Sequence, residues 1–319
     1  MNMNILRELF ANSNPPTKLF FALFIILISY FLITFSTFLI VIPVYSVSFE
    51  ELSLLLSEDL YEANLSILRL FQISQTIGLF IVPAILLNYL LFYKGEGFIS
   101  INPSAHSSYI GLIVLITLIF SMPVIQFLLD LNNSLKFPEW LSFFENKLQQ
   151  MESERNGLTI RLTDNMNLST YLLNLFMIAI LPAIGEEFLF RGVIQKVLLQ
   201  WTRKSHISIL IAAVIFSGIH LQFYGFLPRL VLGIYFGYLF FWSRNIWLAV
   251  WAHFLNNTIA VSLFFLSTRE DIQGTDVLET LGHSGFLELA ISIAISSLLL
   301  LITYQYFKKG RGKQKIRNN

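Results

Sequence analysis

Apolar segments of about twenty residues recur along almost the whole chain, and each is long enough to cross a bilayer as a helix. A spanning segment must satisfy its backbone hydrogen bonds internally, so such a series predicts a bundle of membrane helices. We therefore expect an all-α, polytopic membrane protein with about eight transmembrane helices and a polar intramembrane cavity. The expected spans are approximately residues 19–43, 68–92, 109–130, 169–185 or a later frame of it, 206–222, 226–242, 246–267 and 285–307.

Composition favours the same class of protein. The 319 residues are 55% hydrophobic and include 31 phenylalanines, whereas charged residues make up only 13%. That leaves too little polar surface to enclose a soluble domain. The chain has no cysteine, which excludes disulfides, thiolate metal sites and a cysteine nucleophile. Its net charge of +1 gives no general attraction for nucleic acid, which we do not expect as a partner.

Lysine and arginine are unevenly distributed over the connectors. Alternate connectors and both chain ends collect most of them, while the opposite connectors carry acidic runs at 50–62 and 270–279. By the positive-inside rule, eight spans then place both termini in the cytoplasm. The first apolar run is longer than a signal-peptide core and is expected to remain as a span. Short connectors and the lack of organelle signals favour a bacterial plasma membrane.

The connector 131–168 is the long extramembrane piece. Apolar residues recur in it at helical spacing between charged ones: Trp140, Leu141, Phe144, Leu148 and Met151. This pattern predicts an amphipathic helix lying in the membrane interface. An ordinary loop helix explains the pattern, and a role in gating substrate access is the alternative.

Ionisable residues inside apolar segments are costly and usually face a bundle interior or a water cavity. Glu186 and Glu187 are adjacent, so they point about 100° apart around a helix and cannot both face one target. Glu187 and Arg191 are four residues apart, the spacing at which helical side chains meet. We therefore predict a Glu187–Arg191 pair and leave Glu186 to point into a cavity. A purely structural pair with a spare acid is the alternative.

Two later apolar segments carry histidines. His220 ends one of them, and His253 lies four residues before Asn257 in another, so these two side chains share a helix face. Stacked donors of this kind suit a developing oxyanion, although an interhelical polar contact is the alternative. Asn256 is expected to face elsewhere. Gly233 and Gly237 form a Gly-x-x-x-Gly that favours close helix packing.

Together these groups suggest one reaction. A carboxylate and a histidine can hold a water and accept its proton. A second histidine with an asparagine can stabilise the negative oxygen that forms when the water attacks a carbonyl. The set therefore suggests hydrolysis of a peptide bond without a covalent intermediate.

The residues Glu186-Glu187-x-x-x-Arg191, Phe216-x-x-x-His220 and His253-x-x-x-Asn257 resemble the ordered motifs of the CPBP intramembrane protease family. This family includes type II CAAX prenyl proteases and bacterial Abi, or bacteriocin-processing, relatives. The resemblance covers about residues 170–267. It implies that Glu186 is the general base and His220 its partner in holding water, that His253 and Asn257 form the oxyanion site, and that Glu187 and Arg191 support the geometry.

The resemblance also sets the expected division of the chain. Residues 1–168 would hold three spans and the interfacial loop, 169–267 the catalytic core, and 268–319 the last span with a basic tail. A zinc site from Glu186, His220 and His253 is conceivable. We expect no metal and no other cofactor, because Asn257 one turn from His253 fits an oxyanion donor better. The expected partners are membrane lipids and a peptide or protein substrate, with or without a lipid modification.

One expectation conflicts with the site. A fourth span beginning at 169 puts Glu186 near its cytoplasmic end, whereas His220 ends its own span on the outer side. A helix break at Pro182 and Gly185, with 183–203 as the crossing helix, would remove the conflict. Two other functions use the same residues: a scaffold or immunity protein that binds without hydrolysis, and a proton-coupled transporter. The transporter is disfavoured because no paired inverted halves are visible.

Overall fold

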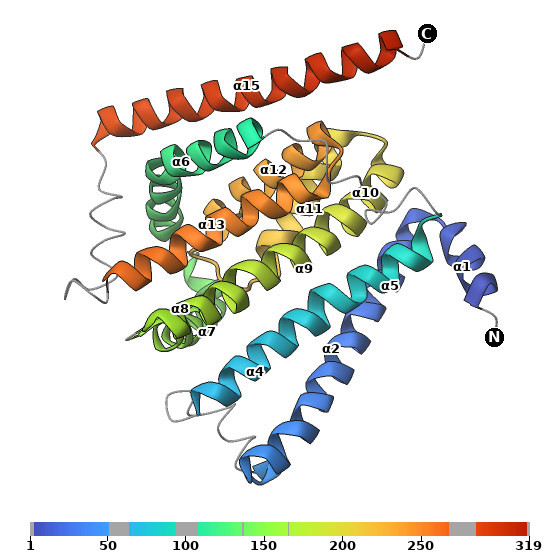
Figure 1. The fold of residues 1–319 in the computed structure, drawn as a ribbon. Helices are drawn as coiled ribbons and strands as arrows, with labels where there is room; N and C mark the ends of the chain where they lie inside the picture. Colours follow the sequence, from blue (N-terminus) through green and yellow to red (C-terminus); the bar gives the residue numbers. More distant parts are fainter. Residues whose placement is uncertain are drawn as a thin grey trace. The chain divides into compact units, whose positions relative to one another are not determined.

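A computed structural model describes residues 3–50, 64–93, 108–135, 137–164, 166–267 and 285–317 (Figure 1). Within these ranges the regular structure is helical throughout, with no strand. Together with seven helices long and apolar enough to span a membrane, this confirms the polytopic helical bundle. Most of the acidic connectors, together with Lys94, lies outside the described residues. The side on which the termini lie therefore stays a prediction.

The chain divides into two compact units. Unit 1 comprises Met1–Ser100 and Ser153–Ser208, and unit 2 comprises Ile101–Glu152 and Ile209–Asn319. Each unit is thus built from segments far apart in the sequence. The division expected from the sequence, with boundaries at 168 and 267, separates functional parts of the chain and not compact units. It stays a prediction.

Unit 1 starts with a short helix and two long helices, the second of which consists of three segments. They are α1 (Met3–Ala11), α2 (Pro15–Tyr45), α4 (Leu65–Thr76), the π-helical η1 (Ile77–Ile81) and α5 (Val82–Leu91). α4, η1 and α5 form one continuous helix that runs beside α2 (Figure 1). Pro83 begins α5 just after the π turn, where the altered hydrogen-bond register accommodates a residue that has no N–H to donate.

The same device shapes the helix that carries the two glutamates. α8 (Leu168–Asn174), η4 (Leu175–Ile180), α9 (Leu181–Leu189), η5 (Phe190–Ile194) and α10 (Gln195–Thr202) form one helix of 35 residues. Asn167 caps its start by accepting a hydrogen bond from the Thr170 backbone N–H. Pro182 sits at the start of α9 behind the π-helical η4, so the helix continues past it.

This continuity corrects two expectations. The fourth span does not end at 185, and no separate crossing helix begins at 183. The break expected at Pro182 and Gly185 is absent, because the helix Leu168–Thr202 is continuous. Glu186 instead lies close to the middle of a single long helix. The boundary from which the depth of Glu186 was inferred is therefore wrong.

Unit 2 holds the remaining helices. They are α6 (Ser108–Ser134), the 3₁₀ turn η3 (Glu139–Leu141), α11 (Ser205–Gly218), α12 (Phe226–Ser243), α13 (Ile246–Ser267) and α15 (Phe286–Arg317). The first turn of α11, up to Ser208, belongs to unit 1. α7 (Ser142–Thr163) begins in unit 2 and ends in unit 1. It confirms a helix in the connector 131–168. α15 packs along α6, and α12 packs against α13 (Figure 1).

Seven of the eight expected spans have the length and composition to cross a membrane, and the segment 206–222 does not. Its helix, α11, has 14 residues, which reach about 21 Å at about 1.5 Å per residue, short of the roughly 30 Å hydrocarbon core. The segment that follows α11 lies beside the end of α6, where Asn132 Nδ2 donates to the Phe223 carbonyl at 2.8 Å. A short helix and an irregular loop thus replace the expected full span.

Large apolar side chains remain exposed along the spanning helices. Phe20 is 74% exposed and Phe31 67%, both on α2. Soluble proteins rarely leave such apolar surfaces uncovered, whereas a membrane helix presents them to lipid. The chain is therefore an integral multi-pass membrane protein, and its buried polar residues need separate explanations.

Candidate active site

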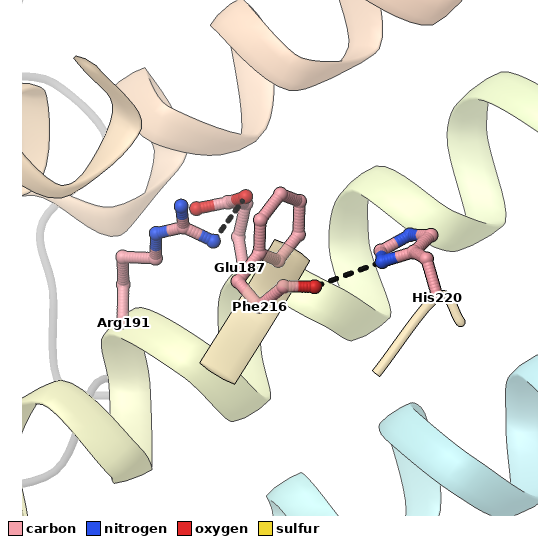
Figure 2. A network of polar contacts seen from close by, with 4 residues as sticks. All are labelled: Glu187, Arg191, Phe216 and His220. Atoms are coloured by element: carbon pink, nitrogen blue, oxygen red, sulfur yellow. Dashed lines mark hydrogen bonds and ion pairs between the residues drawn. The ribbon is translucent and has the colours of Figure 1, made fainter. Parts of the chain in front are cut away.

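Glu187 and Arg191 form a buried ion pair on the long helix of unit 1. Arg191 Nη1 donates to Glu187 Oε1 at 2.9 Å (Figure 2), and the two residues are 1% and 0% exposed. The contact confirms the four-residue pairing expected from the sequence, although Arg191 lies in the π-helical η5. Each charge neutralises the other, which lowers the cost of keeping both away from water.

Glu186 is also buried, with 7% of its surface exposed. It lies on α9, and its charge interacts with Arg191 as well. The residue before it, Gly185, lies where α9 packs against η1. A Cβ at Gly185 would come within 2.9 Å of Phe80 Cβ and of Ile81 Cγ1, so this close approach requires glycine. The packing of Gly185 therefore fixes the position of the helix at Glu186.

His220 follows the end of α11 in unit 2 and is half-buried. Its Nδ1 lies 2.8 Å from the Phe216 carbonyl oxygen (Figure 2). A carbonyl oxygen can only accept, so Nδ1 carries the proton and donates it. In the neutral imidazole, Nε2 then has the lone pair and can accept a hydrogen bond from water.

His253 is held by aromatic rings within unit 2. It is 5% exposed, stacks on Phe236 with ring centroids 5.0 Å apart at 17°, and meets Phe216 edge-on at 5.9 Å and 85°. The same Phe216 ring contacts His220 edge-on at 5.3 Å. Phe216 therefore brings the second and third motifs together, since both imidazoles pack against it.

Asn257 lies one turn after His253 on α13, as the spacing predicted, and is half-buried. Asn256 Nδ2 donates to Asn257 Oδ1 at 3.2 Å. The Asn256 side chain thus reaches the neighbouring amide, and the expectation that it faces away from the side of α13 shared by His253 and Asn257 stays a prediction. This contact turns the oxygen of Asn257 toward Asn256 and leaves the Nδ2 donor end of the amide pointing away from it.

The arrangement sorts the expected residues into two groups. Glu186, Glu187 and Arg191 belong to unit 1, whereas His220, His253 and Asn257 belong to unit 2. Within unit 1 Glu187 pairs with Arg191, and within unit 2 Phe216 contacts both His220 and His253. That all six surround one cavity stays a prediction.

Comparison with known proteins bears on these same motifs. Residues 168–259 match the sequence model of the Rce1-like family, described as type II CAAX prenyl endopeptidase Rce1-like. This confirms the resemblance seen in the motifs. No curated protein and no solved structure matches the chain.

The Rce1-like segment contains all six candidate residues and spans parts of both units. It begins at the first residue of α8 and ends two residues after Asn257. At the level of the family, the match supports an intramembrane protease activity. The roles of the individual residues within the Rce1-like segment are the subject of the proposal below.

The described residues of the Rce1-like segment include no cluster of metal-binding side chains. Among the described residues of either unit, no three His, Asp or Glu side chains gather closely enough to hold a metal ion. The zinc alternative needs Glu186 together with His220 and His253, which belong to different units. It therefore stays an alternative to the metal-free expectation.

Sequence reasoning missed three residues that hold the candidate site. Phe216 was noted only for its spacing, and Phe236 was not singled out, although both clamp His253. Gly185 was interpreted as a helix breaker and is a close-packing residue instead. A signal existed for Gly185, a glycine beside a buried acid in an apolar helix. None existed for Phe236, because contacts between α12 and α13 do not follow from spacing.

Gly233 on α12 was correctly expected to allow close packing. A Cβ there would lie 3.1 Å from Phe216 Cδ1 and 3.2 Å from Ala213 Cβ. The glycine thus lets α12 approach α11 beside Phe216, the ring that both histidines contact.

Proposed function

We propose that this protein is an intramembrane endopeptidase that hydrolyses a peptide bond with water activated by Glu186. The observation that carries the proposal is a buried acid in the middle of a membrane helix, next to a second acid already neutralised by Arg191, within the Rce1-like segment. An intramembrane acid of this kind marks a functional site by default. Glu186 is the acid assigned to chemistry, because it is the buried acid that aligns with the first glutamate of the motif, while Glu187 forms the ion pair with Arg191.

In the proposed reaction, the Glu186 carboxylate and His220 Nε2 each accept a hydrogen bond from one water. The water oxygen attacks the carbonyl carbon of the substrate while one water proton passes to Glu186. His253 and Asn257 donate hydrogen bonds to the oxyanion. The C–N bond then breaks as Glu186 returns the proton to the leaving nitrogen, so the base is regenerated and no covalent intermediate forms.

The local contacts support these roles. The bond from His220 Nδ1 to Phe216 selects the tautomer whose Nε2 can accept. The hydrogen bond from Asn256 Nδ2 to Asn257 Oδ1 orients the Asn257 amide, whose Nδ2 end points away from Asn256. The substrate class proposed is a membrane-associated peptide or protein that reaches the site from lipid, with a lipid modification left open.

The test is Glu186→Gln in purified protein reconstituted into liposomes and incubated with a peptide library. Glutamine keeps the size of the side chain but cannot accept a proton. We expect cleavage to fall by at least 100-fold, the scale of a lost general base. Full activity of Glu186→Gln would refute the assignment.

Two further measurements separate this function from its rivals. A metal chelator should leave cleavage unchanged if the water is activated by Glu186 alone. A scaffold or immunity protein would show no cleavage in the wild-type protein, and its cellular phenotype would survive Glu186→Gln. Proton flux in the same liposomes would indicate a transporter.

A further inference from the structure

The loop after His220 is held unusually firmly. The loop, Leu221–Gly225, joins α11 to α12, and Leu221 has a φ of 52°. This left-handed conformation is disfavoured for a residue with a branched side chain, and it persists only where surrounding contacts impose it. The contacts that impose it therefore also fix the backbone next to the histidine proposed to hold the water.

Asn132 supplies the first of these contacts. It lies near the end of α6, is 1% exposed, and bonds the loop with both ends of its amide. Its Nδ2 donates to the Phe223 carbonyl at 2.8 Å, and its Oδ1 accepts from the Leu227 backbone N–H at 2.8 Å. One side chain thus bridges the loop and the start of α12.

α7 supplies the second set, all to Tyr224. The Tyr224 backbone N–H donates to Glu152 Oε2 at 3.1 Å, Gln149 Nε2 donates to the Tyr224 hydroxyl at 2.7 Å, and that hydroxyl donates to Glu145 Oε1 at 3.3 Å. These three α7 residues follow each other at spacings of four and three, so they share one helix face. The first half of α7 therefore presents a polar face to the loop.

An aromatic contact adds to the polar ones. Phe137, between α6 and η3, packs on Phe223 of the loop with ring centroids 4.6 Å apart, and it also meets Phe144 of α7 at 6.2 Å. The loop, the end of α6 and the start of α7 are thus joined by one contiguous set of contacts within unit 2.

Exposed aromatic side chains lie at the start of α7, away from the polar face. Phe143 is 86% exposed and lies about 160° around the helix from Glu145. Trp140, in the 3₁₀ turn η3 directly before α7, is 80% exposed. Leu131 on the last turn of the spanning helix α6 and Leu135 directly after this helix are exposed as well. Trp at such a position suits the boundary between lipid and water.

We propose that the first half of α7 is a membrane-anchored clamp on the loop Leu221–Gly225. Trp140 and Phe143 insert into the lipid interface, while Glu145, Gln149 and Glu152 hold Tyr224 and thereby the backbone next to His220. The bilayer is the partner of these two aromatic side chains, because both are exposed shortly after the end of the spanning helix α6. The consequence for catalysis rests on the function proposed above, whereas the clamp itself does not.

The first experiment measures where α7 lies. The chain contains no cysteine, so Phe143→Cys gives a single site for a nitroxide label in protein reconstituted into liposomes. We expect the label to collide more with oxygen, which concentrates in lipid, than with a water-soluble nickel chelate. A second labelled variant, Phe31→Cys on α2, gives the reference for a lipid-facing residue. A label at 143 that meets the nickel chelate as freely as a water-exposed site would overturn the anchor.

The second experiment measures whether the anchor holds the loop. A nitroxide at Leu221→Cys reports the mobility of the loop in bilayers. We expect an immobile spectrum, and a mobile component when Tyr224→Phe removes the two hydroxyl bonds or when Trp140→Ser and Phe143→Ser remove the anchor. Phe286→Ser, which removes a 90% exposed aromatic residue at the start of α15, is the matched control and should leave the spectrum unchanged.

The two readouts keep the clamp separate from the enzymatic proposal. Spectra that stay immobile in both clamp variants would refute the clamp even if Glu186→Gln is inactive. Mobile spectra would support the clamp even if no substrate is cleaved. Where cleavage is measurable, the Tyr224→Phe variant should lower kcat more than it raises KM, because it disturbs a reacting group and leaves the substrate-binding surface intact.

Discussion

Replacing Gly185 with alanine tests whether the position of Glu186 depends on how closely α9 approaches η1. A Cβ at Gly185 would lie 2.9 Å from Phe80 Cβ, whereas carbon atoms in contact prefer about 3.5–4.0 Å. Phe80 Cβ is fixed to the backbone and cannot rotate away. The two helical segments must therefore separate by roughly 0.6–1 Å, going by the same contact distance.

That displacement falls on the residue next to the proposed base. A shift of about 1 Å at a reacting group costs on the order of 100-fold in rate. We expect Gly185→Ala to lower kcat by about 10- to 100-fold, or roughly 1.4–2.7 kcal/mol in the barrier. Overpacking should also lower stability by about 1–3 kcal/mol.

The assay compares cleavage rates in liposomes with the thermal unfolding of the same preparations. Gly218→Ala is the matched control, because Gly218 lies two residues before His220 and a Cβ there meets nothing within 4 Å. It should keep both rate and stability. Wild-type activity in Gly185→Ala would refute the reasoning, and equal losses in both variants would show that the effect is not specific to the α9–η1 contact.

Two other contacts give sharp predictions. Glu187→Gln or Arg191→Gln alone should destabilise the protein by about 3–5 kcal/mol in a chemical unfolding assay, because each removes one partner of a buried ion pair. The double variant should recover part of that loss, and an additive loss would contradict the pairing. Asn256→Asp cannot donate to Asn257 Oδ1 and should attract its Nδ2 instead, lowering kcat by about 10- to 1,000-fold, the range seen for a lost oxyanion donor. Asn256→Ser, which keeps a donor, should retain more activity than Asn256→Asp, and equal activity of the two would argue against an orienting role.

Much of the fold could be predicted because lipid imposes a simple rule. A helix that faces lipid must be long and apolar, and seven segments show both properties in sequence and structure. The rule failed at the segment 206–222, whose helix α11 is too short to cross the membrane by itself. α11 is short because the chain leaves the helix at Gly218 and continues into the loop held by Asn132, whose position 91 residues away no hydropathy pattern reveals.

Proline and glycine misled the sequence reasoning at the fourth span. Pro182 in a regular α-helix predicts a kink or a break. The π-helical η4 in front of it changes the hydrogen-bond register, so the helix continues and Glu186 lies near its middle. A π turn has no clear sequence signature, so the structure was needed to place this boundary.

The sequence by itself determined the membrane class, the three motifs and the pairing of Glu187 with Arg191. These depend on composition and on spacing along one helix, where the helical repeat fixes which side chains meet. Only the tertiary structure decided that Phe236 stacks on His253, that Gly185 lies against Phe80, and that Tyr224 is bound by α7. Such contacts join segments distant in the chain, and the register in which two helices pack depends on the shapes of all the side chains between them.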